Sequence, residues 1–159
     1  MKTIDINMKV TECSKSELAP EDLALVESAE KFVGHSYSPY SKFSVSAAVR
    51  LSDGTIVNGT NQENAAYPSG LCAERTAMFY ANSQYPDKPV TALAIAAFTN
   101  GDFLDQPITP CGSCRQVLLE TEQRFSTPIK VILVAKNRCF IVKSISDLLP
   151  LSFGSEFLK

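Results

Sequence analysis

Hydrophobic and polar residues alternate along the first ten positions of the chain. The apolar members of this alternation would share one face of an extended segment, and they are Ile4, Ile6, Met8 and Val10. A period of two residues is typical of a β-strand with one covered face. We therefore expect an extra strand over residues 4–10, at an edge of the sheet.

Three segments show helical patterns. The first begins at Pro20, which suits the first turn of a helix, and its apolar residues recur at helical spacing up to about Gly34. Two further helices are expected from Cys72 to about Gln84 and from Gly112 to about Arg124. These helices separate segments of strand character, so strands and helices alternate along the chain.

Five segments are expected to form the core strands: 43–51, 55–60, 90–98, 129–134 and 139–142. The first two are joined by Ser52-Asp53-Gly54, which predicts a hairpin. The third and fourth are apolar apart from Thr91 and Lys130, which is typical of central strands covered on both faces. Only four residues separate the last two segments, and a parallel connection needs a dozen or more. The last two strands should therefore be antiparallel.

This order of elements predicts an α/β fold. We expect a three-layer α/β/α sandwich with a five-stranded mixed core sheet and the additional N-terminal strand. The chain has 159 residues and shows no internal repeat or linker, so we expect a single domain over 1–159.

Composition and charge exclude several classes of protein. A chain that is 45% hydrophobic and 20% charged is not a disordered tail, and none of its apolar runs approaches the ~20 residues of a membrane-spanning helix. Asp5 and Lys9 interrupt the position of a signal peptide, which favours the cytoplasm. Fifteen basic and 17 acidic side chains leave no cation excess for binding nucleic acid. We expect a small-molecule partner, and neither nucleic acid nor membrane.

Three of the five cysteines lie where predicted helices begin, in Cys72-Ala73-Glu74 and in Cys111-Gly112-Ser113-Cys114. Helix N-termini stabilise thiolates, which are the form that binds metal. Three sulfurs suit Zn²⁺ and leave its fourth position open, as in catalytic sites. The second motif alone is also compatible with a structural metal site or with two idle thiols. Together the two motifs predict one catalytic Zn²⁺ per chain, with these three cysteines as its ligands.

Further motifs surround the three cysteines. They are Tyr37-Ser-Pro-Tyr-Ser-Lys-Phe43, Asn61-Gln-Glu-Asn-Ala-Ala-Tyr-Pro68, Cys72-Ala-Glu-Arg-Thr-Ala77, Pro110-Cys-Gly-Ser-Cys-Arg-Gln-Val-Leu118 and Leu148-Leu-Pro150. With them the chain resembles the cytidine deaminase family over about residues 25–153. The chain departs from the family pattern in two places. Ser46 stands where the family usually has Gly, close enough in sequence to affect packing near a pocket, and segment 4–10 lies outside the family core.

The resemblance implies a hydrolytic, zinc-dependent enzyme that converts cytidine and deoxycytidine to uridine and deoxyuridine and releases ammonia. Glu74 would transfer protons without binding the metal. Arg75 would donate hydrogen bonds to the ligand sulfurs and withdraw charge from them. Arg115 follows Cys114, and the sequence leaves open whether it has such a role or simply caps a helix or forms a surface pair.

The residues that the resemblance places around the substrate are Phe43, Asn61, Glu63 and Ala73. Phe43 would pack on the pyrimidine, the next two would bind the ribose hydroxyls, and Ala73 would contribute its backbone. A carboxylate at position 63 would repel a phosphate, which favours a nucleoside over a nucleotide. The resemblance also implies a homotetramer in which Phe153, or alternatively Phe157, reaches a neighbouring site.

Three other functions are compatible with parts of the sequence. Related deaminases act on nucleoside antibiotics such as blasticidin S, and the core motifs do not separate the two substrates. Polynucleotide editing is disfavoured by the charge and by the tight connection between the last two strands. A zinc-stabilised nucleoside-binding protein without turnover would need a metal site closed by four protein ligands.

Overall fold

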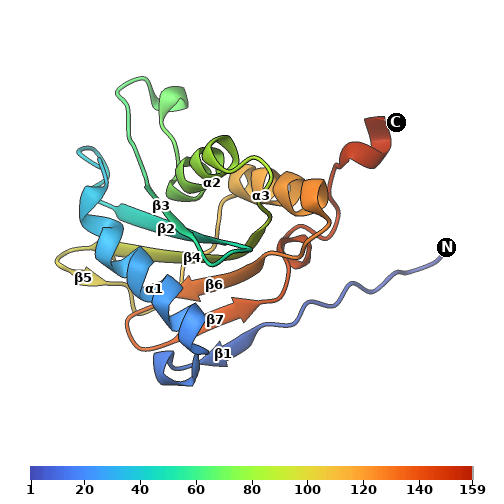
Figure 1. Cartoon of the computed structure of the whole chain (residues 1–159), viewed down its shortest axis with the longest axis horizontal. Helices are drawn as coiled ribbons and strands as arrows, with labels where there is room; N and C mark the ends of the chain where they lie inside the picture. The colour runs from blue at the N-terminus through green and yellow to red at the C-terminus, as the bar shows by residue number, and fades with distance from the viewer. Residues whose placement is uncertain (159) are drawn as a thin grey trace.

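A mixed β-sheet lies between two layers of helices (Figure 1). The computed structural model describes residues 1–158. The strands run in the order β1-β7-β6-β4-β2-β3, and β5 pairs with the end of β4. Their bounds are Thr11–Cys13 (β1), Ser44–Leu51 (β2), Ile56–Thr60 (β3), Val90–Thr99 (β4), Asp102–Phe103 (β5), Lys130–Val134 (β6) and Cys139–Val142 (β7).

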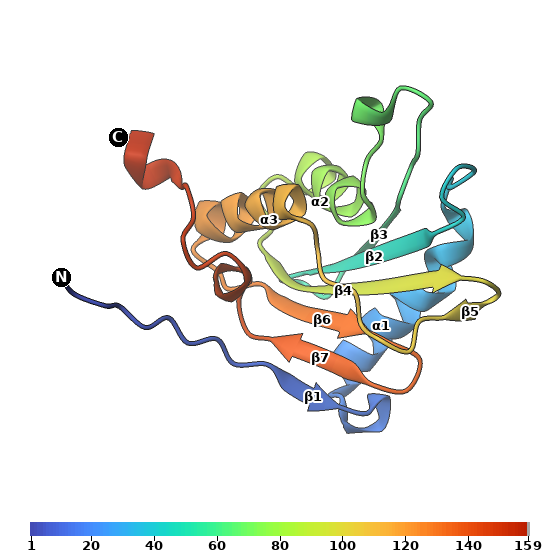
Figure 2. The same ribbon diagram turned by 180° about the vertical axis from the view of Figure 1, so that it is seen from behind.

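The helix α1 (Pro20–Phe32) covers one face of the sheet, and α2 (Ala73–Gln84) and α3 (Gly112–Phe125) cover the other (Figures 1 and 2). Successive residues of β2 face opposite cores: Ala47 packs under α2 and α3, whereas Ala48 packs under α1. The predicted three-layer α/β/α fold is confirmed. Short 3₁₀ helices complete the chain, and they are Lys15–Glu17, Val33–His35, Tyr67–Ser69, Ile145–Leu148 and Ser155–Leu158.

The strand directions agree with the expectations from connection length. β2 and β3 form an antiparallel hairpin, and β6 and β7 are antiparallel. β4 and β6 are parallel, with α3 as the crossover between them. Within the described part of the chain, no helix has the length and apolar character needed to cross a membrane.

The prediction of a strand over residues 4–10 is wrong. Strand β1 begins only at Thr11, and it pairs with β7 through residues 11–13. Thr11 faces Ile141, so a continuation of this register would bring Val10 to Val142, where β7 ends. The alternating segment therefore extends past the end of its sheet partner. An alternating pattern indicates a segment with one face suited to burial. A β-strand also needs a neighbouring strand to accept and donate its backbone hydrogen bonds.

The helix α2 packs against β3 at Gly59 without space for a side chain. A Cβ atom at Gly59 would lie 2.3 Å from the backbone nitrogen of Ala77 and 2.8 Å from the carbonyl oxygen of Ala73. Both atoms belong to the backbone of α2, which cannot rotate away as a side chain could. The depth at which the start of α2 sits on the sheet is therefore set by a glycine.

We expect Gly59→Ala to lower the free energy of unfolding by about 3 kcal/mol, because the added methyl group would force α2 off the sheet. Chemical denaturation with zinc present measures the loss. The matched control is Gly34→Ala, because a Cβ at Gly34 would meet no atom within 4 Å. Equal stability of the two variants would contradict the close contact.

Ser46 is fully buried, and its hydroxyl group has no hydrogen-bond partner in the structure. It shares a face of β2 with Ala48 and with Arg50, whose Nη1 donates to Asp22 of α1. Ser46 therefore faces α1, on the side of the sheet opposite α2 and α3. Ser46 could therefore affect packing near a pocket beside α2 and α3 only indirectly, by shifting the sheet between the two helix layers.

Candidate active site

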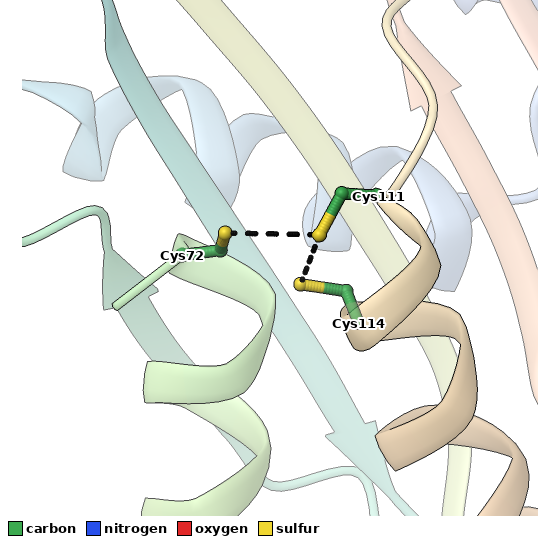
Figure 3. Close-up of side chains that lie close together, drawn as sticks. All are labelled: Cys72, Cys111 and Cys114. Atoms are coloured by element: carbon green, nitrogen blue, oxygen red, sulfur yellow. Dashed lines mark hydrogen bonds between the residues drawn. The ribbon is translucent and has the colours of Figure 1, made fainter. Parts of the chain in front are cut away.

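Three cysteine sulfurs converge where α2 and α3 begin (Figure 3). Cys72 is the residue immediately before α2, Cys111 precedes α3 in the same way, and Cys114 lies in the first turn of α3. The Sγ atom of Cys111 lies 3.9 Å from that of Cys72 and 3.5 Å from that of Cys114. All three Sγ atoms lie within 4.8 Å of one another.

The helices bring these sulfurs together because they run side by side in the same direction. Their first turns meet at the cysteines, and near their last turns Asn82 Nδ2 donates to Thr121 Oγ1 at 3.0 Å. The carbonyl groups of both helices point away from the sulfurs, and the partial positive charge of each N-terminus points toward them. Two segments separated by the whole of β4 thus supply one cluster of sulfur atoms.

The spacing of the sulfurs fits a tetrahedral zinc ion. Zn–S bonds of about 2.3 Å at tetrahedral angles separate two ligand sulfurs by roughly 3.8 Å. The separations of Cys111 Sγ from the other two sulfurs, 3.5 and 3.9 Å, bracket this value, and both are far longer than a disulfide bond. Among residues 1–158, the cluster of mutually close ligand atoms contains these three sulfurs and no fourth group. Three ligands are typical of catalytic zinc, which keeps one position for water or substrate.

Glu74 lies buried beside the cluster, two residues after Cys72 in the first turn of α2. Only 5% of the residue is exposed. Burial raises the pKa of its carboxyl group, and the Cys72 thiolate acts in the same direction. The carboxylate is outside the group of mutually close ligand atoms. Its position and its raised pKa are suited to proton transfer near neutral pH.

Arg75 contacts the cluster directly. Its Nη2 atom lies 3.7 Å from the Sγ atom of Cys72, and its Nε atom is buried without a hydrogen-bond partner. A hydrogen bond from Cys114, with further help from Arg75, lowers the pKa of Cys72 to about 5. The arrangement stabilises a thiolate at Cys72, which is the form that binds metal.

Arg115 does not contact the sulfurs. Its guanidinium group donates from Nε to the carbonyl oxygen of Pro110 and from Nη1 to that of Leu148, both at 2.8 Å, and from Nη2 to Thr109 Oγ1 at 3.2 Å. Of the alternatives that the sequence left open, the structure supports neither a sulfur partner nor a surface ion pair. Arg115 connects the loop that leads into Cys111 to Leu148, in the last 3₁₀ helix before the C-terminal segment, by hydrogen bonds.

An open cavity of about 640 Å³ adjoins Cys72 and Arg75. It contains two of the residues expected around the substrate, Asn61 and Glu63, but neither Phe43 nor Ala73 is among its lining residues. The full lining consists of Tyr40, Ser41, Asn61, Gln62, Glu63, Asn64, Tyr67, Gly70, Leu71, Cys72 and Arg75. This volume lies within the range that is typical of small-molecule sites.

Asn61 and Glu63 also organise the loops around this cavity. Asn61 Oδ1 accepts from the backbone nitrogen of Val45 at 2.8 Å, and Asn61 Nδ2 donates to the carbonyl oxygen of Phe43 at 2.9 Å. Glu63 accepts hydrogen bonds from the backbone of Tyr40 and from the backbone and hydroxyl group of Ser41. These bonds lower the pKa of Glu63, with the Ser41 hydroxyl as the main cause. The side chain is therefore an ionised acceptor.

Phe43 is half-buried, and its backbone is held next to Asn61. Ala73 is fully buried at the start of α2. Phe153 lies far along the chain on the C-terminal segment, where it is 57% exposed and stacks on Phe157 with ring centroids 5.6 Å apart. The structure therefore gives Phe153 no contact with the cavity of its own chain.

Sequence reasoning missed two aromatic residues at the cavity. Tyr40 and Tyr67 both line it, and their rings form an edge-to-face pair with centroids 6.3 Å apart. Both are largely exposed, at 53% and 79%. Each lies within a segment that carries the family resemblance. Their positions in these loop segments were the signal from which a place at the cavity could have been predicted.

Comparison with known proteins agrees with this geometry. The family model described as the cytidine and deoxycytidylate deaminase zinc-binding region matches residues 20–127. The cytidine deaminase of Halalkalibacterium halodurans is 40% identical over 120 residues, which cover 76% of this chain and 84% of that relative. The cytidine deaminase of Sporosarcina psychrophila is 47% identical over 96 residues, covering 60% and 66% of the two chains.

A solved structure has a similar fold. The cytidine deaminase of Burkholderia pseudomallei superposes with a TM-score of 0.68 at 38% sequence identity, covering 82% of this chain and 97% of that one. The chain belongs to the cytidine and deoxycytidylate deaminase family. The family, the fold and the zinc cofactor expected from the motifs are thereby confirmed.

Proposed function

We propose that this chain deaminates cytidine and deoxycytidine by hydrolysis in pyrimidine salvage, giving uridine and deoxyuridine with release of ammonia. The observation that carries this function is a buried carboxyl group, Glu74, beside three sulfurs that match the ligand set of catalytic zinc. Curated relatives with 40% and 47% identity are named cytidine deaminases, which supports cytidine as a substrate and the hydrolytic enzyme class.

The site residues divide the chemistry between them. Cys72, Cys111 and Cys114 hold Zn²⁺, which when bound supplies the Lewis acidity that makes water a nucleophile at neutral pH. Glu74 accepts one proton from the attacking water and delivers it to the ring N3. It then takes the proton of the hydroxyl group newly bound to C4 and delivers it to the amino group, which leaves as ammonia while the C4 carbonyl of the product forms. Its burial supports this role, because a raised pKa lets one carboxyl group both accept and donate protons.

We assign the sugar to the Asn61 and Glu63 side of the cavity. An ionised Glu63 accepts hydrogen bonds from two hydroxyl groups and repels a phosphate, which favours a free nucleoside. We assign the pyrimidine to the Cys72 side, with the ring of Phe43 and the backbone of Ala73 as its neighbours. Asn61, Glu63 and Cys72 line the same cavity, which supports binding of base and sugar together.

We also propose that the chain acts in the cytoplasm, as a single domain and as a homotetramer, with Phe153 contacting a neighbouring site and Phe157 as the alternative. All five cysteines are free, as expected in a reducing compartment. The two phenylalanines are exposed on the C-terminal segment, where a neighbouring subunit would cover them. Neither nucleic acid nor membrane is a proposed partner.

The alternatives are less well supported. The named relatives act on cytidine, which does not favour blasticidin S as the substrate. A binding protein without turnover would need four protein ligands, but the cluster found among residues 1–158 has three. The antiparallel pairing of β6 and β7 agrees with the nucleoside enzymes rather than with polynucleotide editing.

The direct test is an ultraviolet assay of cytidine loss by the zinc-loaded protein, with ammonia release measured in parallel for cytidine, deoxycytidine and blasticidin S. We expect turnover of the two nucleosides and none of the antibiotic. Absence of turnover of either nucleoside by fully zinc-loaded protein would overturn the proposed function.

We expect Arg75→Gln to keep zinc but to lose activity by roughly 10- to 100-fold, because the Cys72 sulfur would lose its cationic partner. Zinc content by atomic absorption and kcat for cytidine measure the two effects. Arg75→Lys serves as the conservative control and should recover part of the activity. Full turnover by zinc-replete Arg75→Gln would remove this role from Arg75.

A further inference from the structure

The apolar residues of the N-terminal segment are exposed in the single chain. Ile4, Ile6, Met8 and Val10 are 76%, 52%, 50% and 45% exposed, although they alternate with polar residues as in a half-covered strand. The segment is extended and leaves the body of the molecule beyond β1 (Figure 1). Among residues 1–158 no strand pairs with it. Four large apolar side chains in a row on one segment indicate a surface that is covered in the assembled protein.

The neighbouring edge of the sheet is also free. β1 is the last strand of the sheet, and its one paired neighbour among the described strands is β7. The outer edge of residues 11–13 therefore presents unpaired backbone groups, which accept another strand readily. The N-terminal segment continues directly into this edge, so residues 2–12 form one line of backbone whose outer edge has no paired strand among the described residues.

The sequence of this line is complementary to itself when reversed. Two copies aligned antiparallel about Asn7 place Asp5 opposite Lys9 and Lys2 opposite Glu12, and by symmetry each ion pair occurs twice. The same alignment joins the apolar residues into one row on one face. The apolar pairs across the two strands are Ile4 with Val10 and Ile6 with Met8.

Other alignments lose this complementarity. Centring the pair on Asp5 or on Lys9 sets two like charges opposite each other, which is destabilising. Centring it on Ile6 leaves Asp5 facing Asn7, and centring it on Met8 sets Ile4 against Glu12. A slip of one residue places apolar residues against polar ones on both faces. The alignment about Asn7 satisfies both charge and hydrophobic pattern.

We propose that the N-terminal segments of two copies of this chain pair as antiparallel β-strands in the register centred on Asn7. Each segment then runs along the free edge of β1 in the other copy, and the two sheets join across a twofold axis. The interface is isologous, since residue i of one copy meets residue 14 − i of the other. This inference concerns assembly through a segment outside the family core, and it does not rest on the proposed function.

Charge reversal tests the pairing. In sedimentation velocity over a concentration series, Lys9→Glu should raise the dissociation constant of this association about tenfold, because both ion pairs with Asp5 become repulsive. The double variant Asp5→Lys with Lys9→Glu restores opposite charges and should return to within about threefold of the unmodified chain. Lys31→Glu on the exposed face of α1 changes the net charge equally and is the matched control. Equal behaviour of Lys9→Glu and Lys31→Glu, or no recovery in the double variant, would overturn the proposal.

Disulfide trapping tests the register. In the proposed alignment the two copies of residue 7 lie opposite each other with Cα atoms about 4.5–5.5 Å apart, within the range of a disulfide. The two copies of residue 5 lie about 13 Å apart along the strands, which is out of range. Zinc-loaded Asn7→Cys treated with diamide should form a covalent dimer, whereas Asp5→Cys and the unmodified chain should not. Equal trapping of the two variants, or none of Asn7→Cys, would exclude the register.

Discussion

Replacing Glu74 with glutamine should lower kcat for cytidine by about 10⁴-fold while leaving zinc content near one ion per chain. Glutamine keeps the size of the buried side chain but cannot accept a proton from water or return it to the pyrimidine. Because the carboxylate is not among the clustered ligand atoms, the metal should stay. The ultraviolet assay, with zinc measured on the same sample, separates the two effects.

The matched control for this variant is Glu122→Gln. Glu122 is another buried helical glutamate, and its carboxylate accepts from the backbone nitrogens of Ile129 and Ile145 and from the Ser144 hydroxyl. Loss of the negative charge at Glu122 should weaken these hydrogen bonds and lower the thermal stability. It should leave kcat within about twofold, since Glu122 lies on α3 away from the sulfurs. If zinc-loaded Glu74→Gln kept more than a tenth of normal turnover, another group would have to transfer the proton.

Cys114→Ser should reduce zinc affinity by more than about 100-fold and abolish turnover in zinc-poor buffer, because a ligand is lost from a site that has only three. The helices α2 and α3 should also become less stable relative to the rest of the fold, since the metal joins their first turns. Competition with a chelator of known affinity measures the first effect, and hydrogen exchange of the two helices measures the second.

Cys139→Ser is the control, since Cys139 is equally buried but lies on β7, away from the metal cluster. It should keep its zinc and its activity, with a small loss of stability. A Cys114→Ser protein that retained zinc as firmly as Cys139→Ser would show that this sulfur is not a ligand.

Much of the fold could be predicted because the signals were local and strong. Proline at the start of α1, predominantly apolar runs in β4 and β6, and a four-residue connection between β6 and β7 each limit the chain to one local structure. The short strand β5 was missed because it pairs through only two residues and has no periodicity to detect. The strand over 4–10 was wrongly expected because a pattern does not reveal whether a neighbouring strand reaches that far.

The site could be predicted as far as its motifs extend. Cysteines at two helix starts, with a glutamate beside one of them, are typical of catalytic zinc sites. The cysteine cluster could therefore be predicted from the sequence alone. The bonds of Asn61 to Phe43 and Val45, in contrast, link separate strands and depend on the hairpin register. The contact between Gly59 and α2 likewise depends on tertiary packing and left no pattern in the sequence.

Arg115 links the segment around Leu148 to the loop that leads into Cys111. One rigid, planar guanidinium group holds both the carbonyl of Leu148 and that of Pro110, the residue directly before Cys111. We therefore expect a displacement of the backbone at Leu148 to move the loop that presents the Cys111 sulfur. Truncations or fused tags at the C-terminus should be judged by their effect on zinc retention, even though they lie outside the cavity.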